Sequence, residues 1–217
     1  MSALSRSEHV NPGIAAARRL AELGCCTIAP GLTDAEFARI EAEHGFEFAD
    51  DHRAFLAAGL PMNSPFVPEP DTWTTWEKPW PEWRDGDPVE LRKQLDWPVD
   101  YLLWDVEKIG YWRPDWGTRP ESLEAALQVA RLALADVPRL VPVYAHRFLP
   151  AGRGTSGHPV LSVRGTDTIY FGTDLAEYID REFEEPTPEL PDDWSPQATV
   201  PFWRDYVAPP FTGRTTT

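Results

Sequence analysis

The residue types best suited to catalysis lie on either side of a glycine-rich loop. His146 and His158 flank this loop, and with a carboxylate such as Asp167 they could bind a metal ion or serve a hydrolase. Their spacing matches no common metal-binding motif, which favours structural or surface roles. The sequence therefore predicts no catalytic residue, no metal site and no cofactor. A hydrolase that uses one histidine and a carboxylate is kept as an alternative.

The loop itself, residues 152–157, has the spacing G-x-G-x-x-G. A dinucleotide site needs that spacing between a strand and a helix, so that the phosphates meet the helix N-terminus. Here His158, Pro159 and a predicted strand follow instead. Ser156 also lacks the second glycine of a nucleophile elbow, because position 158 is histidine. We expect a hairpin loop that binds no nucleotide.

The segment 61–88 combines seven prolines with four tryptophans. The tryptophans are Trp73, Trp76, Trp80 and Trp83. So many prolines disfavour helix and central strand, which predicts an extended loop with its indoles partly buried against the body. The same indoles, with Asp85 and Asp87 as a charged rim, could instead anchor a protein partner. A third interpretation is a platform on which sugar rings stack.

Charge narrows the choice of partner. The 217 residues include 35 acids and 20 lysines and arginines, for a formal net charge of −15. Such a chain repels phosphate backbones, so nucleic acid is excluded as a direct partner and a basic protein is favoured. Residues 174–193 hold nine acids and one arginine, a pattern that serves solubility or speeds association with a basic partner. We expect partner contacts at the tryptophan segment, with Glu184 and Glu185 as an alternative patch.

Location follows from what the sequence lacks. No run of about 20 apolar residues is present, which predicts no membrane span. The N-terminus has no apolar stretch of the kind found in signal peptides. The only cysteines, Cys25 and Cys26, are adjacent and cannot join distant segments. We therefore expect reduced thiols in a cytoplasmic protein.

Capping signals and periodicity predict the elements that carry these residues. Helices are expected at 12–23, between Thr33 and Gly45, and from an N-cap at Asp50 to Gly59; Thr33 and Glu36 form a capping box. A short helix at 88–94 and a strand at 101–106 should follow. The remaining predicted elements are a helix at 119–135, strands at 140–147, 160–163 and 168–171, and a final helix at 173–184.

This order of elements predicts an α+β fold, with N-terminal helices packed on a mostly antiparallel sheet and a closing helix. A single domain is expected over residues 1–184. Residues 185–217, rich in proline and acids, are expected to form a C-terminal tail.

Residues 31–60 carry a pattern that resembles a known family. The pattern is G-L-T-x-x-E, then I-E, a glycine that ends the helix, an acidic pair and F-L. It is similar to the opening of the SUKH superfamily, which includes fungal cell-wall-assembly regulators and many bacterial immunity proteins. Members usually have Leu-Pro where this chain has Phe48-Ala49, and Tyr where it has His52. The segments at 142–144 and 170–172 resemble the strand region, so the similarity covers residues 30–184.

The resemblance implies an α+β, non-enzymatic protein that binds another protein. Bacterial members neutralise toxins, often nucleases, and a basic toxin would complement the charge of −15. The expected function is therefore that of an immunity protein for a cognate toxin. A glycan-binding or cell-wall-related regulatory module that uses the tryptophan segment is the other interpretation. The superfamily has no common catalytic motif, and the oligomeric state is left open.

Overall fold

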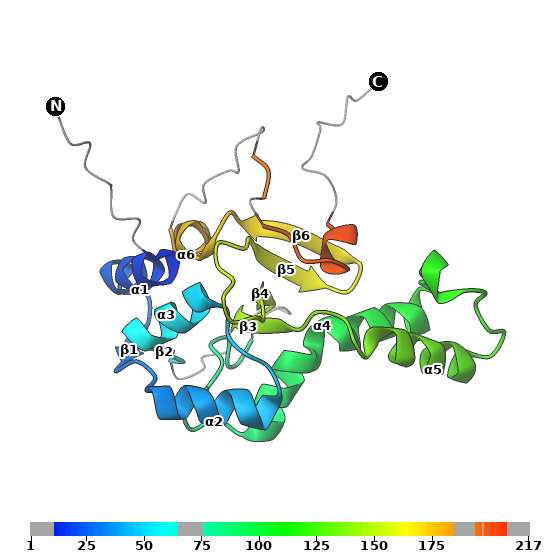
Figure 1. Ribbon diagram of the computed structural model, residues 1–217, viewed down its shortest axis with the longest axis horizontal. Helices are drawn as coiled ribbons and strands as arrows, with labels where there is room; N and C mark the ends of the chain where they lie inside the picture. Colours follow the sequence, from blue (N-terminus) through cyan, green and yellow to red (C-terminus); the bar gives the residue numbers. More distant parts are fainter. Residues whose placement is uncertain (1–10, 65–75, 185–193, 197, 208–217) are drawn as a thin grey trace, which may run out of the picture.

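A computed structural model describes residues 11–64, 76–184, 194–196 and 198–207. Within these residues the chain forms six α-helices and two antiparallel sheets, which confirms the α+β class. Figure 1 shows a body of helices around the larger sheet, from which helices α4 and α5 extend as an arm on one side.

Three helices open the fold near their predicted positions: α1 is Pro12–Leu23, α2 is Asp34–His44 and α3 is Asp50–Ala58. The expected capping box is present, since Thr33 Oγ1 accepts a hydrogen bond from the N–H of Glu36 and the Glu36 carboxylate accepts one from the N–H of Thr33. Asp50 does not cap α3 as expected. It is the first helical residue, and Ala49 occupies the N-cap position.

Helix α4, Pro88–Lys108, corrects the prediction of a short helix at 88–94 and a strand at 101–106. The whole stretch is one helix with Pro98 inside it. The run at 101–106 is almost entirely apolar, and such a run does not distinguish a buried strand from a buried helix. Leu102 and Val106 are fully buried, while Trp104 remains exposed, so the helical period holds here.

Helix α5, Leu123–Leu134, begins later than expected because the Ser122 hydroxyl caps it by accepting a hydrogen bond from the N–H of Ala125. The larger sheet then follows, with strands in the order β3 (Leu140–Tyr144), β4 (Arg147–Pro150), β5 (Val160–Arg164) and β6 (Asp167–Gly172). Helix α6, Leu175–Phe183, closes this part of the chain.

The predicted strand at 140–147 is divided into β3 and β4 by a tight turn. Ala145 has a φ of +46° there, and its N–H donates to the carbonyl oxygen of Pro79 at 2.7 Å. A small second sheet, β1 (Thr27–Ala29) with β2 (Leu60–Met62), was not predicted.

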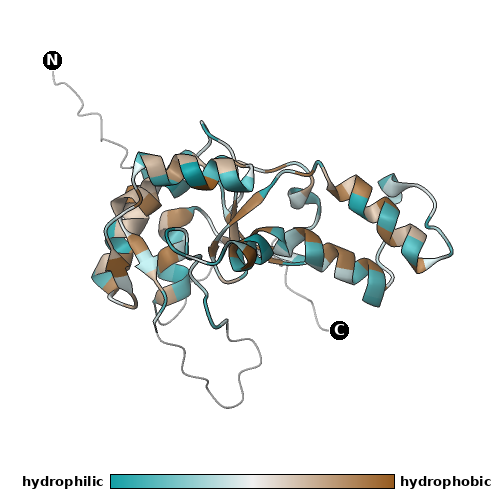
Figure 2. Ribbon diagram, turned by 90° about the horizontal axis from the view of Figure 1, so that it is seen from below, coloured by the Kyte–Doolittle hydropathy of each residue, from teal (hydrophilic) through white to brown (hydrophobic). Residues whose placement is uncertain are grey.

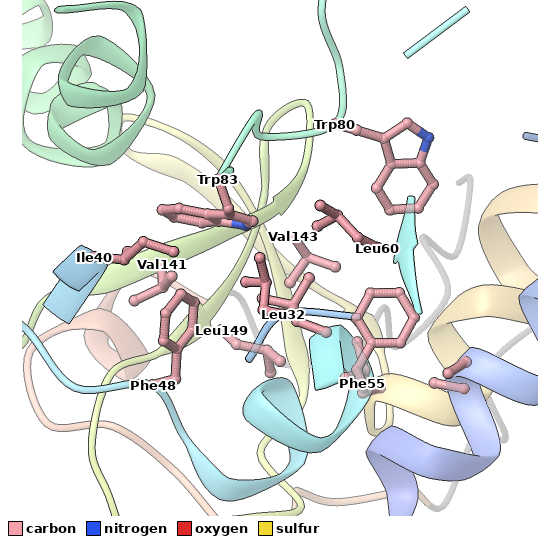
Figure 3. Packing of buried hydrophobic residues seen from close by; sticks show 14 of the residues in the cluster. Leu32, Ile40, Phe48, Phe55, Leu60, Trp80, Trp83, Val141, Val143 and Leu149 are labelled. Carbon is pink, nitrogen blue, oxygen red and sulfur yellow. The ribbon is translucent and has the colours of Figure 1, made fainter. Parts of the chain in front are cut away.

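Successive strand residues point to opposite faces of the four-stranded sheet, and strands β3 and β4 are buried on both faces. Val141 and Leu149 join a core with α1, α2, α3 and α6 (Figure 3), while their neighbours Leu140 and Phe148 join a second core with α4.

Trp203 is a buried member of the second core, and its Nε1–H donates to the carbonyl oxygen of Pro138 at 2.6 Å. Val207 pairs with Thr168 of β6. The described part of the expected tail thus packs on the sheet, and the folded unit extends past residue 184.

Candidate functional site

The structure divides the tryptophan segment between the core and the surface. Trp80 and Trp83 are buried, and Figure 3 shows both among the core side chains. Trp83, only 1% exposed, packs edge-on against Phe48, with ring centroids 5.2 Å apart, and Trp80 stacks on Phe183. These two indoles stabilise the fold and offer a partner no surface, which corrects their assignment as contacts. Trp73 lies outside the described residues.

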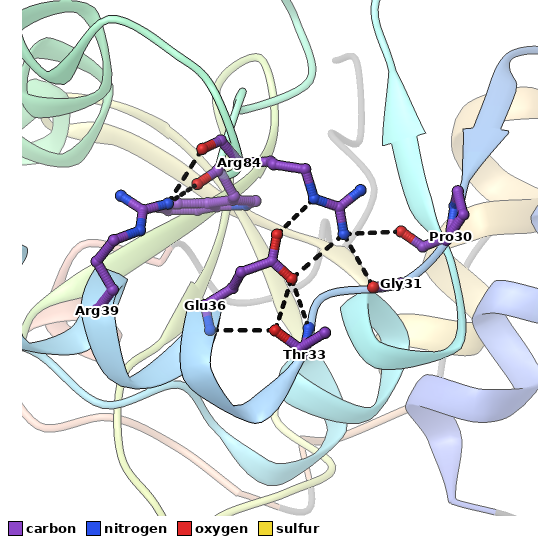
Figure 4. Close-up of polar contacts among 7 residues, drawn as sticks. Pro30, Gly31, Thr33, Glu36, Arg39 and Arg84 are labelled. Atoms are coloured by element: carbon purple, nitrogen blue, oxygen red, sulfur yellow. Dashed lines mark hydrogen bonds and ion pairs between the residues drawn. The ribbon is translucent and has the colours of Figure 1, made fainter.

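An arginine pair ties this segment to α2 (Figure 4). Arg84 Nε donates to Glu36 Oε1 at 2.5 Å, and its Nη2 donates to the carbonyl oxygens of residues 30 and 31. Arg39 Nη2 donates to the carbonyl oxygens of Trp83 and Arg84, both at 3.1 Å. The Arg84 hydrogen bond, helped by Thr33, lowers the pKa of Glu36 to about 2. The capping glutamate of α2 therefore also positions the residues that precede α4.

Asn63 holds the other side of the segment. Its Nδ2 donates to the carbonyl oxygen of Trp80, and its Oδ1 accepts from the N–H of Trp80, both at 2.9 Å. This two-way pairing replaces strand hydrogen bonds in a stretch whose prolines cannot donate. The backbone before α4 is thus fixed at several points, which gives the neighbouring surface a defined shape.

A groove of about 350 Å³ lies between this segment and the first turns of α4. Trp76, Trp97 and Leu91 supply its apolar surface, and four carboxylates and two lysines supply its charge. Two of the predicted contact residues, Trp76 and Asp87, line this groove. Asp85 lines a smaller neighbouring pocket of about 110 Å³ and is exposed.

The charges of the groove do not balance. Lys78 Nζ lies 2.7 Å from Glu82, and Lys93 Nζ lies 2.7 Å from Glu90, so both lysines are already paired. Glu77 makes no ion pair within the described part of the chain.

Asp87 is the other carboxylate of the groove without a cation, again among the described residues. It caps α4, since its Oδ1 accepts from the N–H of Val89 at 2.8 Å. With four carboxylates and two lysines, the described lining of the groove has a formal charge of −2.

An aromatic stripe, defined as Trp76, Trp97, Tyr101 and Trp104, runs from the groove along one face of α4. Successive ring centroids lie 4.7, 4.8 and 5.6 Å apart. Trp97 is oriented by its Nε1–H, which donates to the carbonyl oxygen of Val163 at 3.0 Å, whereas Trp104 is 47% exposed. Prediction from sequence missed this stripe because it assigned residues 101–106 to a strand. The spacing of 97, 101 and 104 is helical and could have revealed it.

The alternative acidic patch is partly neutralised. Glu184 Oε2 lies 2.9 Å from Arg19 Nη2, and the same guanidinium contacts Asp180. Glu185 lies outside the described residues. The groove is therefore a better candidate than this patch for an acidic surface that binds a partner.

The two candidate histidines have separate surroundings. His146 Nε2 contacts the guanidinium of Arg147, and burial together with this positive charge lowers the pKa of His146 to about 4. Burial also lowers the pKa of His158, whose charged neighbour is Asp51. In the part of the chain that the structure describes, no group of three or more His, Cys, Asp or Glu side chains could hold a metal ion.

The glycine-rich loop binds carboxylates of its own chain. The N–H of Gly154 donates to Asp50 Oδ1 at 3.0 Å, and the N–H of Gly157 donates to Asp51 Oδ2 at 2.8 Å. These backbone donors, which would cradle phosphate in a nucleotide site, latch the loop to the start of α3 instead. A strand, β5, follows the loop as predicted.

None of the helices in the described ranges combines the length and apolarity needed to cross a bilayer. Comparisons of the chain with family models, with curated proteins and with solved structures gave no match. The resemblance to the SUKH superfamily therefore stays a prediction.

Proposed function

We propose that the protein is a non-enzymatic binding protein that docks a basic protein partner on the groove and the aromatic stripe. The observation that carries this proposal is the pairing pattern in the groove, where Lys78 and Lys93 pair with Glu82 and Glu90 while Glu77 and Asp87 have no ion pair within the described ranges. An aromatic surface bordered by free carboxylates suits a cationic partner, because tryptophan supplies contact area and the carboxylates supply attraction.

The chain as a whole supports the same partner. A net charge of −15 speeds the encounter with a basic protein by long-range attraction, which salt screens over about 8 Å at physiological ionic strength. Burial of the indoles at the centre of the contact would then set the dissociation rate.

The extent of the surface also suits a protein partner. A stable interface covers about 800 Å² on each partner, which is more than one groove provides. The stripe extends the contact along α4, since Trp97 and Trp104 are seven residues apart, about 10 Å along a helix. Trp104 at its far end is exposed and has no core role to satisfy.

Following the resemblance in residues 31–60, we propose further that the partner is a cognate toxin and that binding neutralises it. A toxin that cleaves nucleic acid needs a cationic surface, and an acidic protein that occludes this surface competes with the substrate. A cytoplasmic location belongs to the same proposal and is supported by two free thiols, Cys25 and Cys26.

The test uses basic toxins encoded next to this gene, each purified as a catalytically inactive variant. Isothermal titration at 150 mM salt should give a stoichiometric complex with one of them. The matched variants are Glu77→Gln with Asp87→Asn in the groove and Trp104→Ala on the stripe. Each should weaken binding, whereas Glu121→Gln before α5 should not. If the groove and stripe variants bind as tightly as the wild type, the groove and the stripe are not part of the interface.

A glycan-binding module is the second candidate, favoured by the aromatic stripe with its exposed Trp104, because sugar rings stack on indoles and carboxylates accept hydrogen bonds from hydroxyls. The same variants can be titrated with a panel of neutral oligosaccharides. Saturable glycan binding that is lost in Trp104→Ala, together with no binding of any basic protein, would replace the proposed function with this one.

A further inference from the structure

We propose that the groove receives an arginine side chain of the partner, and that it selects arginine over lysine. This inference rests on the proposed function and names the group that the groove recognises. It is carried by an arrangement that the molecule repeats within its own fold and leaves incomplete at the groove.

The repeated arrangement is an arginine placed over an aromatic ring and paired with a carboxylate. Arg147 lies 3.7 Å from the centroid of Phe171 while its Nε donates to Glu182 at 2.9 Å. Arg53 lies 4.0 Å from the centroid of Phe37.

Two more arginines, Arg53 and Arg113, have the same carboxylate pairing, whereas Arg119, 5.9 Å from the centroid of Trp112, has no carboxylate partner among the described residues. Arg53 Nη2 lies 2.7 Å from Asp34. Arg113 lies 4.8 Å from the centroid of Phe202 and donates to Asp115 and Asp205. A planar guanidinium can stack on a ring and bind a carboxylate with its edge at the same time, which a compact ammonium does less well.

The groove contains two parts of this arrangement and lacks the third. Its aromatic part is Trp76 with Trp97, whose ring centroids lie 4.7 Å apart with the planes inclined by 55°. Its acidic part consists of Glu77 and Asp87. Asp87 Oδ1 accepts the N-cap hydrogen bond, and its Oδ2 has no hydrogen-bond partner among the described residues. No arginine lines the groove within the described ranges.

The lysines of the groove do not supply the missing cation. Lys78 and Lys93 point their ammonium groups at Glu82 and Glu90, and neither lies over a ring in the described part of the chain. The side chains of both lysines are at least half exposed, so these ion pairs lie at the solvent-facing edge of the groove. Among the described residues Glu77 and Asp87 have no ion pair, so the groove offers these carboxylates and the two indoles to a cation from outside.

The experiment titrates the full chain with two capped peptides of equal length and charge, one with three arginines and one with three lysines, while the indole N–H signals are followed by NMR. We expect the arginine peptide to bind about tenfold more tightly, since a guanidinium can stack on an indole and pair with a carboxylate at once, which an ammonium does less well. Only signals of indoles at the groove should move. Trp76→Leu should abolish the preference.

The double variant Glu77→Gln with Asp87→Asn should weaken both peptides, and it keeps the helix intact because asparagine still caps α4. Glu121→Gln serves as the control and should bind like the wild type. Equal affinity for the two peptides, or a preference that Trp76→Leu leaves unchanged, would overturn the inference. If a basic toxin still binds through the groove in that case, the proposed function stands without arginine selection; if neither toxin nor peptide binds there, both fail.

Discussion

Asp105 in α4 accepts a hydrogen bond through its Oδ2 from the backbone N–H of Thr166, 2.7 Å away in the turn between β5 and β6. The carboxylate is buried, and the turn is closed by Gly165 at a φ of +62°. A Cβ on that glycine would lie 2.1 Å from Asp105 Oδ2, so the backbone approaches the carboxylate as closely as it can. This contact joins the arm to the end of the sheet.

Asp105→Ala should therefore destabilise the protein by about 1–3 kcal/mol, because it leaves the N–H of Thr166 without its acceptor. Asp105→Asn should cost less, since the amide oxygen can still accept. Urea unfolding followed by far-UV circular dichroism measures both, with Glu121→Gln as a control expected within about 0.5 kcal/mol of the wild type. Equal stability of the wild type and Asp105→Ala would show that the contact contributes nothing.

Stability should fall in mild acid because of His52. This residue is buried against Phe48, neither ring nitrogen has a hydrogen-bond partner among the described residues, and burial lowers its pKa to about 3. Below pH 6.5 the unfolded chain takes up a proton at His52 that the folded chain refuses. The free energy of unfolding should thus decrease as the pH drops from about 6.5 towards 3, by up to about 1.4 kcal/mol per pH unit for this histidine.

His52→Phe removes the titrating group and keeps an aromatic ring at the position. Its free energy of unfolding, measured in urea at pH 7.5, 6.5, 5.5 and 4.5, should fall less steeply than that of the wild type. The remaining slope belongs in part to His146, whose pKa is lowered to about 4. Identical slopes for the variant and the wild type would mean that His52 is protonated in the folded protein.

The tryptophans of the groove and its surroundings should separate into a buried and an exposed class. Trp83→Ala removes a fully buried ring and should cost about 3–5 kcal/mol of stability. Trp104→Ala removes an exposed ring and should change stability by less than about 1 kcal/mol while weakening the partner complex. Thermal unfolding and titration on the same samples give both quantities. A Trp104→Ala protein that unfolds as readily as Trp83→Ala would place Trp104 in the core.

Association with a basic partner should slow as salt rises, and the double variant Glu77→Gln with Asp87→Asn should make that dependence shallower. The free carboxylates steer the encounter, so their loss acts on the association rate more than on the dissociation rate. Stopped-flow mixing at 50, 150 and 400 mM salt measures the effect. An association rate that does not respond to salt would remove steering from the proposed mechanism.

Local signals were sufficient for several elements. The capping box of Thr33 and Glu36 and the left-handed glycines Gly24 and Gly45 mark helix ends through interactions that span only a few residues, and α1 and α2 lie where those signals place them. The run at 101–106 carries no such signal. Its almost entirely apolar residues suit a buried strand as well as a buried helix, and packing on the sheet and on α5 decides for the helix.

The groove, too, was predicted only in part from the sequence. Trp76 and Asp87 were expected to contact a partner and line the groove, whereas Trp80 and Trp83, of the same type and a few residues away, are core residues. What separates them is contact with residues distant in the chain, such as Phe48 for Trp83. The sequence alone does not show which of these tryptophans is buried and which lines the groove.

Composition and local pattern alone determined the acidity of the chain, its α+β class, the ends of the first helices and the presence of an aromatic, acidic segment before residue 88. The tertiary structure decided which of those indoles are buried, which carboxylates keep an unpaired charge, and that α4 continues the aromatic surface as far as Trp104. The reason is physical: helix caps and net charge depend on neighbours along the chain, while burial and ion pairing depend on groups such as Arg84 and Glu36, which only folding brings together.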